Sequence, residues 1–364
     1  MIESIGMKVK ITGSGSYIPD HNIPNSAFLN KHFYNEDGTP VGNENEVVIE
    51  KLQAITGIKS RKYADEALRT SDIAAIACEK AIEDAQVDRE TIDQIIVGHN
   101  FGDIIKGSLQ PDMVPSIGSR VKYILGIKNT ACIPYDVIFG CPGWIQGLIQ
   151  ANSYIQSGMA KKCLVVGAET LSRIVDPHDR DSMIFADGAG AVVIEATDDD
   201  SSSGILSYAV TSHGQEDTYY LYMGATYKGK EQEKEPQYIK MHGRKIYEYA
   251  LKHVPNAIKT CLDKANITDI TKVKKIFIHQ ANAKMDEAII KRLYKKYGVR
   301  DIDVDQVMPM NIGTFGNSSV ATVPTLFDLV KKGKVPGHQL QAGDIVVFAS
   351  VGAGMNINAI TYKM

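Results

Sequence analysis

The sequence lacks the patterns by which metal-binding and disulfide-rich proteins are recognised. It has five cysteines in 364 residues, widely spaced and without a CxxC pair, and its nine histidines form no HExxH or HxH group. An odd number of distant cysteines argues against a disulfide framework. The missing ligand patterns argue against zinc or another catalytic metal. We therefore expect no metal site.

Long hydrophobic runs and a one-sided charge are missing as well. No apolar segment approaches the roughly 18 residues that a membrane helix needs, and the first ten residues lack the apolar core of a secretory signal. The formal net charge of −3 gives no reason to expect nucleic acid or an anionic membrane as a partner. We expect a soluble, cytoplasmic protein with one large domain or two closely packed ones.

Helical patterns alternate with short β-branched runs along the whole chain, which predicts an α/β layered fold. The clearest helices are predicted at residues 71–86, 142–157, 244–265, 283–297 and 318–332. The clearest strands are predicted at residues 94–98, 163–167, 189–195, 275–278 and 345–349. These strands are continuously apolar rather than alternating, so we expect them to be covered on both faces.

The two halves of the sequence repeat the same order of segments. Each half has a helix followed by a buried strand, a Phe-Gly pair before a polar residue at the head of the next helix, and a closing buried strand. The polar residue is Cys141 in the first half and Asn317 in the second. Such a duplication could place equivalent strand ends around one crevice. We place the boundary in the polar run 198–203, between halves 1–203 and 204–364.

Cys141 is the candidate nucleophile. It lies between Gly140 and Pro142, and proline suits the first position of a helix because it has no N–H to leave unpaired. Cys141 would then face the positive end of a helix dipole, which lowers the pKa of a thiol. The alternative is that Cys141 is a small core residue, as free cysteines usually are.

His279 and Asn317 are the candidate partners of that nucleophile. Taken singly, His279 could be a satisfied core histidine, and Asn317 could be a helix N-cap. The repeat places Asn317 opposite Cys141 and His279 on the preceding strand, so that all three would converge on one face. Cysteine, histidine and asparagine also serve papain-like proteases, so these residue types alone leave the reaction open.

Several short segments match one known family. His-Gln-Ala-Asn at 279–282 followed by Gly-Asn-Ser-Ser at 316–319 is highly specific. Weaker matches are Thr56-Gly57-Ile58, Val165-Val166-Gly167-Ala168-Glu169, Ala186-Asp187-Gly188-Ala189-Gly190-Ala191 and Gly352-Ala353-Gly354. From about Ile11 to its end the sequence thus resembles the β-ketoacyl-acyl carrier protein synthase III family of the thiolase superfamily. The resemblance implies a homodimer with a thiolase-like α/β fold, in which two duplicated halves form a layered α-β-α-β-α sandwich.

The resemblance also implies the reaction, a decarboxylative Claisen condensation that initiates fatty acid biosynthesis. Cys141 would take an acyl group from a coenzyme A or other thioester, with the N–H groups of Cys141 and Ala353 as the oxyanion hole; each such donor contributes about 3 kcal/mol in comparable sites. Malonyl-acyl carrier protein would then lose carbon dioxide. His279 and Asn317 would donate hydrogen bonds to the resulting enolate. This acyltransferase chemistry requires no metal or redox cofactor.

The family's substrate-binding positions can be carried over in the same way. The resemblance assigns carrier-protein binding to Gln280, Ala281, Asn282, Ala283 and Lys284, and coenzyme A binding to Arg180 and Asn282. Lys284 and Lys291 fall on one face of the predicted helix 283–297, which suits an acidic carrier, although most such faces are simply solvated.

Val114 falls in the loop that closes the acyl pocket across the dimer. Some members of the family carry a phenylalanine there that restricts them to short primers. We therefore expect Val114 to leave room for a primer longer than acetyl.

One departure from the family concerns the coenzyme A adenine. The family commonly has a tryptophan shortly before Thr-Gly-Ile, but residues 50–55 contain none, and the only tryptophan is Trp144. The segment formed by residues 35–45 is also longer and more polar than is usual in the family. Coenzyme A would therefore bind differently or weakly, and the acyl donor could be another carrier.

Two alternative functions remain open at this point. The first is a condensing enzyme of a specialised polyketide, quinolone or aryl-polyene-type pathway. The second is a non-catalytic partner subunit of a heterodimeric synthase, which we would expect to have lost one of the three polar residues. An enzyme of the hydroxymethylglutaryl synthase type would need a glutamate as base. The motif His-Gln-Ala-Asn argues against that type. The natural primer and the pathway do not follow from the sequence.

Overall fold

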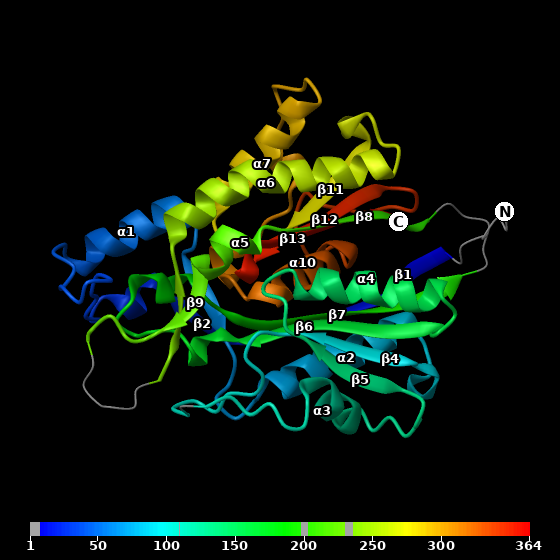
Figure 1. The fold of residues 1–364 in the computed structure, drawn as a ribbon, viewed down its shortest axis with the longest axis horizontal. Coiled ribbons are helices and arrows are strands. Elements are labelled where there is room, and N and C mark those ends of the chain that lie inside the picture. The colour runs from blue at the N-terminus through cyan, green and yellow to red at the C-terminus, as the bar shows by residue number, and fades with distance from the viewer. Residues whose placement is uncertain (1–7, 109, 198–202, 230–235) are drawn as a thin grey trace.

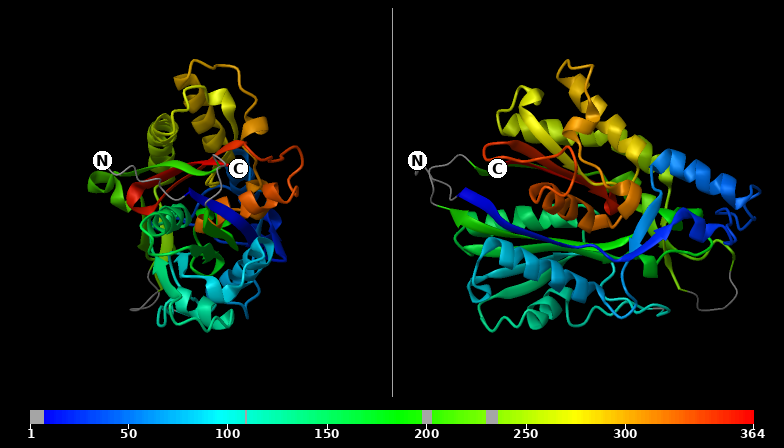
Figure 2. Two further views of the ribbon diagram at one scale, coloured as in Figure 1. Left: turned by 90° about the vertical axis from the view of Figure 1, so that its right-hand side faces the viewer. Right: turned by 180° about the vertical axis from the view of Figure 1, so that it is seen from behind.

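The chain folds into alternating layers of helices and sheets (Figures 1 and 2). The computed structural model describes residues 8–108, 110–197, 203–229 and 236–364. Two mixed sheets sandwich a central helix layer, and further helices cover the outer face of each sheet (Figure 1). The predicted α-β-α-β-α sandwich is thereby confirmed.

The first sheet has the strand order β1-β7-β6-β4-β5. Its strands are β1 (Lys8–Tyr17), β7 (Asp187–Thr197), β6 (Lys162–Thr170), β4 (Gln94–Gly98) and β5 (Ile133–Val137). The second sheet has the order β11-β12-β13-β8. Its strands are β11 (Val273–Ile278), β12 (Ile345–Gly352), β13 (Asn356–Lys363) and β8 (Gly204–Ser212).

The two sheets share one pairing pattern. In the first sheet β4 runs parallel to β6, β6 pairs antiparallel with β7, and β7 pairs antiparallel with β1. In the second sheet β11 runs parallel to β12, β12 pairs antiparallel with β13, and β13 pairs antiparallel with β8. This agrees with the repeat in the sequence. The boundary predicted in the run 198–203 lies, except for Ser203, outside the described residues and stays a prediction.

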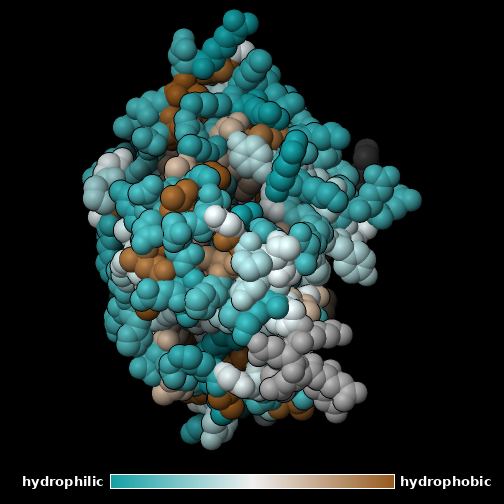
Figure 3. Space-filling view, turned by 90° about the vertical axis from the view of Figure 1, so that its left-hand side faces the viewer, coloured by the Kyte–Doolittle hydropathy of each residue, from teal (hydrophilic) through white to brown (hydrophobic). Residues whose placement is uncertain are grey.

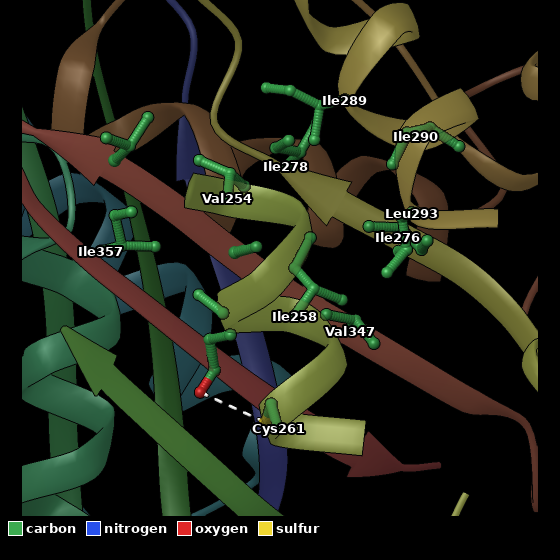
Figure 4. Close-up of a cluster of buried hydrophobic side chains, with 14 of the residues drawn as sticks. Val254, Ile258, Cys261, Ile276, Ile278, Ile289, Ile290, Leu293, Val347 and Ile357 are labelled. Carbon is green, nitrogen blue, oxygen red and sulfur yellow. Dashed lines mark hydrogen bonds between the residues drawn. The ribbon is translucent and has the colours of Figure 1, made fainter. Parts of the chain in front are cut away.

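The helices form three layers with distinct cores. The central layer consists of α4 (Gly143–Gln156) and α10 (Thr322–Lys331), and α2 (Thr70–Ala85) and α3 (Ile117–Ile124) cover the first sheet. On the second sheet, α6 (Gly243–Lys264) and α7 (Ala283–Lys296) pack Val254, Ile258, Ile289 and Leu293 against Ile276 and Val347 (Figure 4). Burial of these aliphatic side chains on both faces explains why the strands are continuously apolar.

Smaller elements complete the fold and surround the ends of the sheets. The remaining helices are α1 (Asn45–Thr56), α5 (Gly214–Asp217), α8 (Val304–Val307) and α9 (Ile312–Phe315). The hairpins are β2 (His21–Pro24) with β3 (Ser60–Tyr63) and β9 (Leu221–Gly224) with β10 (Tyr238–Met241). Within the described ranges, none of the helices combines the length and apolar character needed to span a bilayer.

The predicted elements recur with small shifts at their ends, apart from one helix. The helix predicted at 318–332 begins only at Thr322, because residues Ser319–Ala321 form a 3-10 turn and Ser319 has a positive φ of 51°. Trp144 is buried in the central layer, where its indole N–H donates to the Val165 carbonyl oxygen at 3.3 Å and its ring meets Phe348 edge-on. It therefore serves the core.

Candidate active site

Cys141 lies in the loop between β5 and α4, directly against the turn that carries Ala353. The two loops approach so closely that only glycine fits at two positions. A Cβ on Gly140 would lie 2.6 Å from the Ala353 nitrogen, and one on Gly352 would lie 2.4 Å from the Cys141 nitrogen. Gly140 also has a φ of +66°, a conformation that glycine adopts without strain. Backbone packing thus brings Cys141 and Ala353 together.

The thiol of Cys141 is more basic than the sequence predicts. Burial raises its pKa to about 11, and the nearby Glu169 carboxylate acts in the same direction, whereas a hydrogen bond from the Ser319 hydroxyl at 3.2 Å opposes the rise. α4 does begin just after Cys141, at Gly143. The expectation of a lowered thiol pKa is nevertheless wrong for the free chain, because desolvation disfavours the charged thiolate.

His279 follows the end of β11 and is buried. Its backbone N–H donates to the Ala349 carbonyl oxygen at 2.8 Å, and its Nδ1 lies 2.7 Å from the Thr322 hydroxyl oxygen. Thr322 Oγ1 donates its hydrogen to the Ser319 carbonyl oxygen at 2.9 Å, so that it accepts from Nδ1–H of His279. Burial lowers the pKa of His279 to about 4. The ring is therefore neutral at pH 7, with Nε2 as a proton acceptor.

Asn317 lies in the loop between α9 and α10, and hydrogen bonds of its backbone hold it in place. Its N–H donates to the Ile184 carbonyl oxygen at 2.9 Å, and its carbonyl oxygen accepts from the Ala186 N–H at 2.8 Å. Its side-chain Oδ1 accepts from the Ser319 N–H at 2.8 Å. Since Oδ1 is engaged, the Nδ2 hydrogens are the part of the amide that remains for a ligand.

All three predicted residues line one inner cavity of about 440 Å³, and Ala353 lines it too. The rest of the wall is mostly apolar. It includes Phe101, Ile138, Phe185, Leu221, Met223, Ile239 and Met355. An outer cavity of about 570 Å³ adjoins it and shares the wall residues Met241, Ile246, Ala281, Met285 and Asn317. The two cavities are therefore continuous along a wall of five residues.

The outer cavity lies at the end of the molecule that carries α1. It is lined by Arg180 and Asn282, together with Lys51 and Leu52 of α1 and Arg244 at the start of α6. This end, seen in Figure 3, is mostly hydrophilic, with hydrophobic side chains in small separate patches. Arg180 is exposed, and the Asn282 side-chain oxygen caps α7 by accepting from the Met285 N–H at 3.0 Å. Cations at the mouth suit a phosphate-bearing substrate arm.

The residues predicted to bind the carrier protein differ in their exposure. Lys284 is exposed on α7, whereas Ala281, Asn282 and Ala283 are half-buried. Gln280 is buried, donates to the Pro309 carbonyl oxygen at 2.8 Å and accepts from the N–H groups of Asn311 and Ile312. The Gln280 side chain thus holds the segment that leads to Asn317, and it has no exposed surface for a carrier.

Val114 stands apart from both cavities of the single chain. It is 85% exposed, in a loop whose Asp112 and Asp103 carboxylates both bind Arg120. Its predicted role in an acyl pocket depends on a second subunit and stays a prediction.

Four polar residues for which no role follows from the sequence lie beside the predicted three. Asn100 and Ser319 line the inner cavity, while Glu169 and Thr322 contact residues that do. Ser319 and Glu169 lie in segments that match the family. That match was the signal in the sequence by which these two residues could have been found. Their contacts depend on three-dimensional proximity between loops distant in sequence.

Comparisons with known proteins agree on one family. Residues 135–214 match the profile of 3-oxoacyl-[acyl-carrier-protein (ACP)] synthase III, and residues 262–364 match the profile of its C-terminal part. The chain is 32% identical to β-ketoacyl-[acyl-carrier-protein] synthase III of Ruegeria pomeroyi, over 97% of this chain and 98% of the relative. It is 33% identical to the Staphylococcus aureus (strain Newman) protein with that description, over 98% and 99%.

A solved structure supports the same conclusion. The 3-oxoacyl-[acyl-carrier-protein] synthase III from Aquifex aeolicus VF5 superposes with a TM-score of 0.76 at 28% identity, covering 98% of this chain and 100% of that chain. The chain therefore belongs to the 3-oxoacyl-[acyl-carrier-protein] synthase III family and is an acyltransferase of the condensing type.

Proposed function

We propose that Cys141, His279 and Asn317 carry out a decarboxylative condensation between an acyl primer and malonyl-acyl carrier protein. The observation that carries this proposal is their convergence on one mostly apolar cavity, whose wall also includes Ala353. The product is a 3-oxoacyl-carrier protein, and the reaction initiates fatty acid biosynthesis.

The first half-reaction transfers the acyl group to Cys141. The neutral Nε2 of His279 accepts the thiol proton as sulfur attacks the thioester carbonyl, and then passes that proton to the departing thiolate of the acyl donor. The N–H groups of Cys141 and Ala353 hold the negative carbonyl oxygen of the tetrahedral intermediate. The close packing of Gly140 and Gly352 supports this role, because it sets the two N–H groups in adjoining loops.

The second half-reaction uses the malonyl thioester. Loss of carbon dioxide leaves an enolate, whose oxygen the Asn317 Nδ2 group holds by a hydrogen bond. The enolate carbon attacks the acyl-Cys141 carbonyl and expels the Cys141 thiolate, which completes the new carbon–carbon bond. Loss of carbon dioxide generates the carbanion, so this step needs no strong base. The buried His279, whose pKa burial lowers to about 4, can therefore remain neutral.

Members of this family condense their substrates without a metal or redox cofactor. In the described part of the chain, no group of three or more His, Cys, Asp or Glu residues is arranged to hold a metal ion. In the second half-reaction the expelled Cys141 thiolate takes up one proton from solvent, which restores the resting thiol.

The substrates are thioesters of coenzyme A or acyl carrier protein, which the family uses. In our proposal their phosphate groups meet Arg180 at the outer cavity, and the acidic carrier docks against Lys284 and Lys291 of α7. Asn282, at the rim beside Lys284, contacts the pantetheine arm.

A homodimer is the assembly that the surface supports. In the described part of the first sheet, β5 has a strand neighbour on one side only. Exposed Ile133 on β5 and exposed Tyr123 and Ile124 of α3 border that edge. An apolar edge strand of this kind favours pairing with a second copy. A partner could then bring its Val114 loop toward the acyl pocket.

The alternatives are not favoured. A non-catalytic partner subunit would not need three polar residues converging on one cavity. The relatives by sequence named above are described as β-ketoacyl-[acyl-carrier-protein] synthase III, and none of those descriptions names a specialised pathway. We place the protein in the cytoplasm, because the reaction needs a reduced Cys141 thiol and cytosolic thiols are kept reduced.

Intact-protein mass spectrometry tests the proposal. Incubation with acyl-coenzyme A or acyl carrier protein should add one acyl mass to Cys141, and malonyl carrier protein should then remove it as a 3-oxoacyl product. Cys141→Ser should take up no acyl group. Uptake by Cys141→Ser, or no uptake by the wild type from a full panel of primers, would contradict the assignment.

A further inference from the structure

Ser319 adopts an unusual backbone conformation at the centre of the site. It opens the 3-10 turn Ser319–Ala321 with a φ of +51° and is 4% exposed. A side chain other than glycine is disfavoured in this left-handed region, so surrounding contacts must hold it there. Every polar atom of Ser319 has such a contact.

The hydroxyl group of Ser319 bridges Asn100 and Cys141. Its Oγ lies 3.1 Å from Asn100 Nδ2 and 3.2 Å from Cys141 Sγ. An amide NH₂ group only donates, so Oγ accepts from Asn100, and its single hydrogen is directed to the Cys141 sulfur. The polarity of this chain of hydrogen bonds is thereby determined.

Glu169 anchors the other side of Asn100. The carboxyl group of Glu169 is buried, and its Oε1 accepts the second hydrogen bond of Asn100 Nδ2, at 2.5 Å. With both contacts made, the Asn100 amide cannot rotate without losing a buried hydrogen bond. Burial raises the pKa of Glu169 to about 8, so that at higher pH the ionised carboxylate adds to the rise in the pKa of the Cys141 thiol.

The backbone of Ser319 contacts the other two catalytic residues. Its N–H donates to Asn317 Oδ1 at 2.8 Å. Its carbonyl oxygen accepts from Thr322 Oγ1 at 2.9 Å, and that hydroxyl oxygen lies 2.7 Å from His279 Nδ1. Ser319 thus contacts the nucleophile through its side chain and Asn317 through its main chain, and it reaches His279 through the Thr322 hydroxyl.

We propose that Ser319 is a further catalytic residue, whose hydroxyl stabilises the attacking sulfur of Cys141 in the acylation step, and that Asn100 is a positioning residue that orients this hydroxyl. The proposal rests on the function proposed above. The Ser319 proton stays on its oxygen throughout, while the thiol proton of Cys141 moves to His279 Nε2 and then to the leaving thiolate. The Ser319 hydrogen bond shortens as charge develops on sulfur, since ionised acceptors form the stronger bonds.

The test compares Ser319→Ala with Ser319→Gly, and Ser318→Ala serves as the matched control from the same turn. Both Ser319 variants lose the hydroxyl but keep the backbone contacts to Asn317 and Thr322, and glycine also accepts the positive φ without strain. Acylation of Cys141, followed by mass spectrometry, should slow about tenfold or more in both. The pH profile of Cys141 alkylation by iodoacetamide should shift upward by about one unit. Ser318→Ala should acylate Cys141 at the wild-type rate and with the wild-type pH profile.

The outcomes separate this proposal from the proposed function. If the wild type acylates Cys141 and either Ser319 variant does so at the wild-type rate and with the wild-type pH profile, the role of Ser319 is overturned while the proposed function stands. If the Ser319 variants fail to fold, the same two measurements on Asn100→Ala test the proposal. A slowed acylation with an upward shift of the alkylation profile supports the chain of hydrogen bonds, and an unchanged profile overturns it.

Discussion

Cys141 and His279 are both driven toward their neutral forms by burial. The thiol pKa rises to about 11 and the imidazole pKa falls to about 4. The resting pair at pH 7 is therefore a thiol beside a neutral base, not a thiolate beside an imidazolium. A thiol that is protonated at pH 7 reacts slowly with other electrophiles, because the thiolate is the nucleophile.

The reactivity of Cys141 toward iodoacetamide should follow this ionisation. Only the thiolate reacts, so the rate should rise with pH through 9 and continue to rise toward the thiol pKa of about 11. Stopped-flow or mass-spectrometric alkylation over this pH range measures the profile, with Cys141→Ser as the unlabelled control. A plateau below pH 8 would show instead the lowered pKa that a helix N-terminus predicts from sequence.

Asn317→Ala should separate the two half-reactions. The Nδ2 donor serves the enolate and not the acyl transfer, so acyl-Cys141 should still form. Condensation should fall by about a hundredfold or more, the usual effect of losing one oxyanion donor. Acylation is measured by intact mass and condensation by the 3-oxoacyl product. Normal condensation by Asn317→Ala would remove the role assigned to this residue.

At the scale of elements, the helix α7 combines a buried face with a basic surface. Met285, Ile289 and Leu293 are buried, while Lys284 and Lys291 are exposed, and Lys291 pairs with Glu287 one turn earlier. The N-terminus of α7 borders the outer cavity through Asn282. A carrier docked on this face would present its substrate arm at the cavity mouth.

Reversing both charges, in Lys284→Glu with Lys291→Glu, should weaken binding of the acidic carrier. We expect the KM for malonyl-acyl carrier protein to rise about tenfold and the KM for an acyl-coenzyme A primer to change little, because rim charges act mainly on the encounter with a charged partner. The matched control is Lys259→Glu, on the separate helix α6, where Lys259 forms an exposed pair with Asp263. Equal effects on both substrates would argue against a carrier surface on α7.

The elements that the sequence predicts well are those with a strong local pattern. The strand predicted at 94–98 coincides with β4, and the helix predicted at 283–297 differs from α7 by one residue. β1 and β13 were not singled out, because glycine, threonine and asparagine dilute their apolar character and their stability comes from pairing with β7 and β12. The late start of α10 depends on tertiary contacts of Ser319, for which the local sequence carries no signal.

At the scale of the whole molecule, the acyl pocket of a dimer would combine walls from two subunits. Within one chain, the inner cavity is bounded by Met223 and Ile239 of the β9–β10 hairpin and by Ile138 before Cys141. Val114, Tyr123 and Ile133 are all exposed in the single chain. In our proposal the length of primer that the enzyme accepts therefore depends on the dimer and not on one chain alone.

Val114→Phe should shift the primer preference toward acetyl and propionyl thioesters. The added ring would fill space that longer chains occupy, and each buried methylene contributes about 0.8 kcal/mol, close to fourfold in affinity. Competition assays with a series of acyl primers measure the preference, while decarboxylation of malonyl carrier protein should stay unchanged. A wild-type enzyme that already prefers acetyl over hexanoyl and longer primers would end the idea of a deep pocket.

The sequence by itself determined the layered α/β class, the repeat of its halves, and Cys141, His279 and Asn317 as candidates, because hydrophobic periodicity and short motifs are local properties of a chain. Only the tertiary structure decided how these residues ionise and what orients them. Burial sets the pKa values of Cys141 and His279, and burial depends on neighbours from both halves. The contacts of Ser319 with Asn100 and Cys141 join loops 219 and 178 positions apart, a proximity that arises only when the two sheets pack around the central helices.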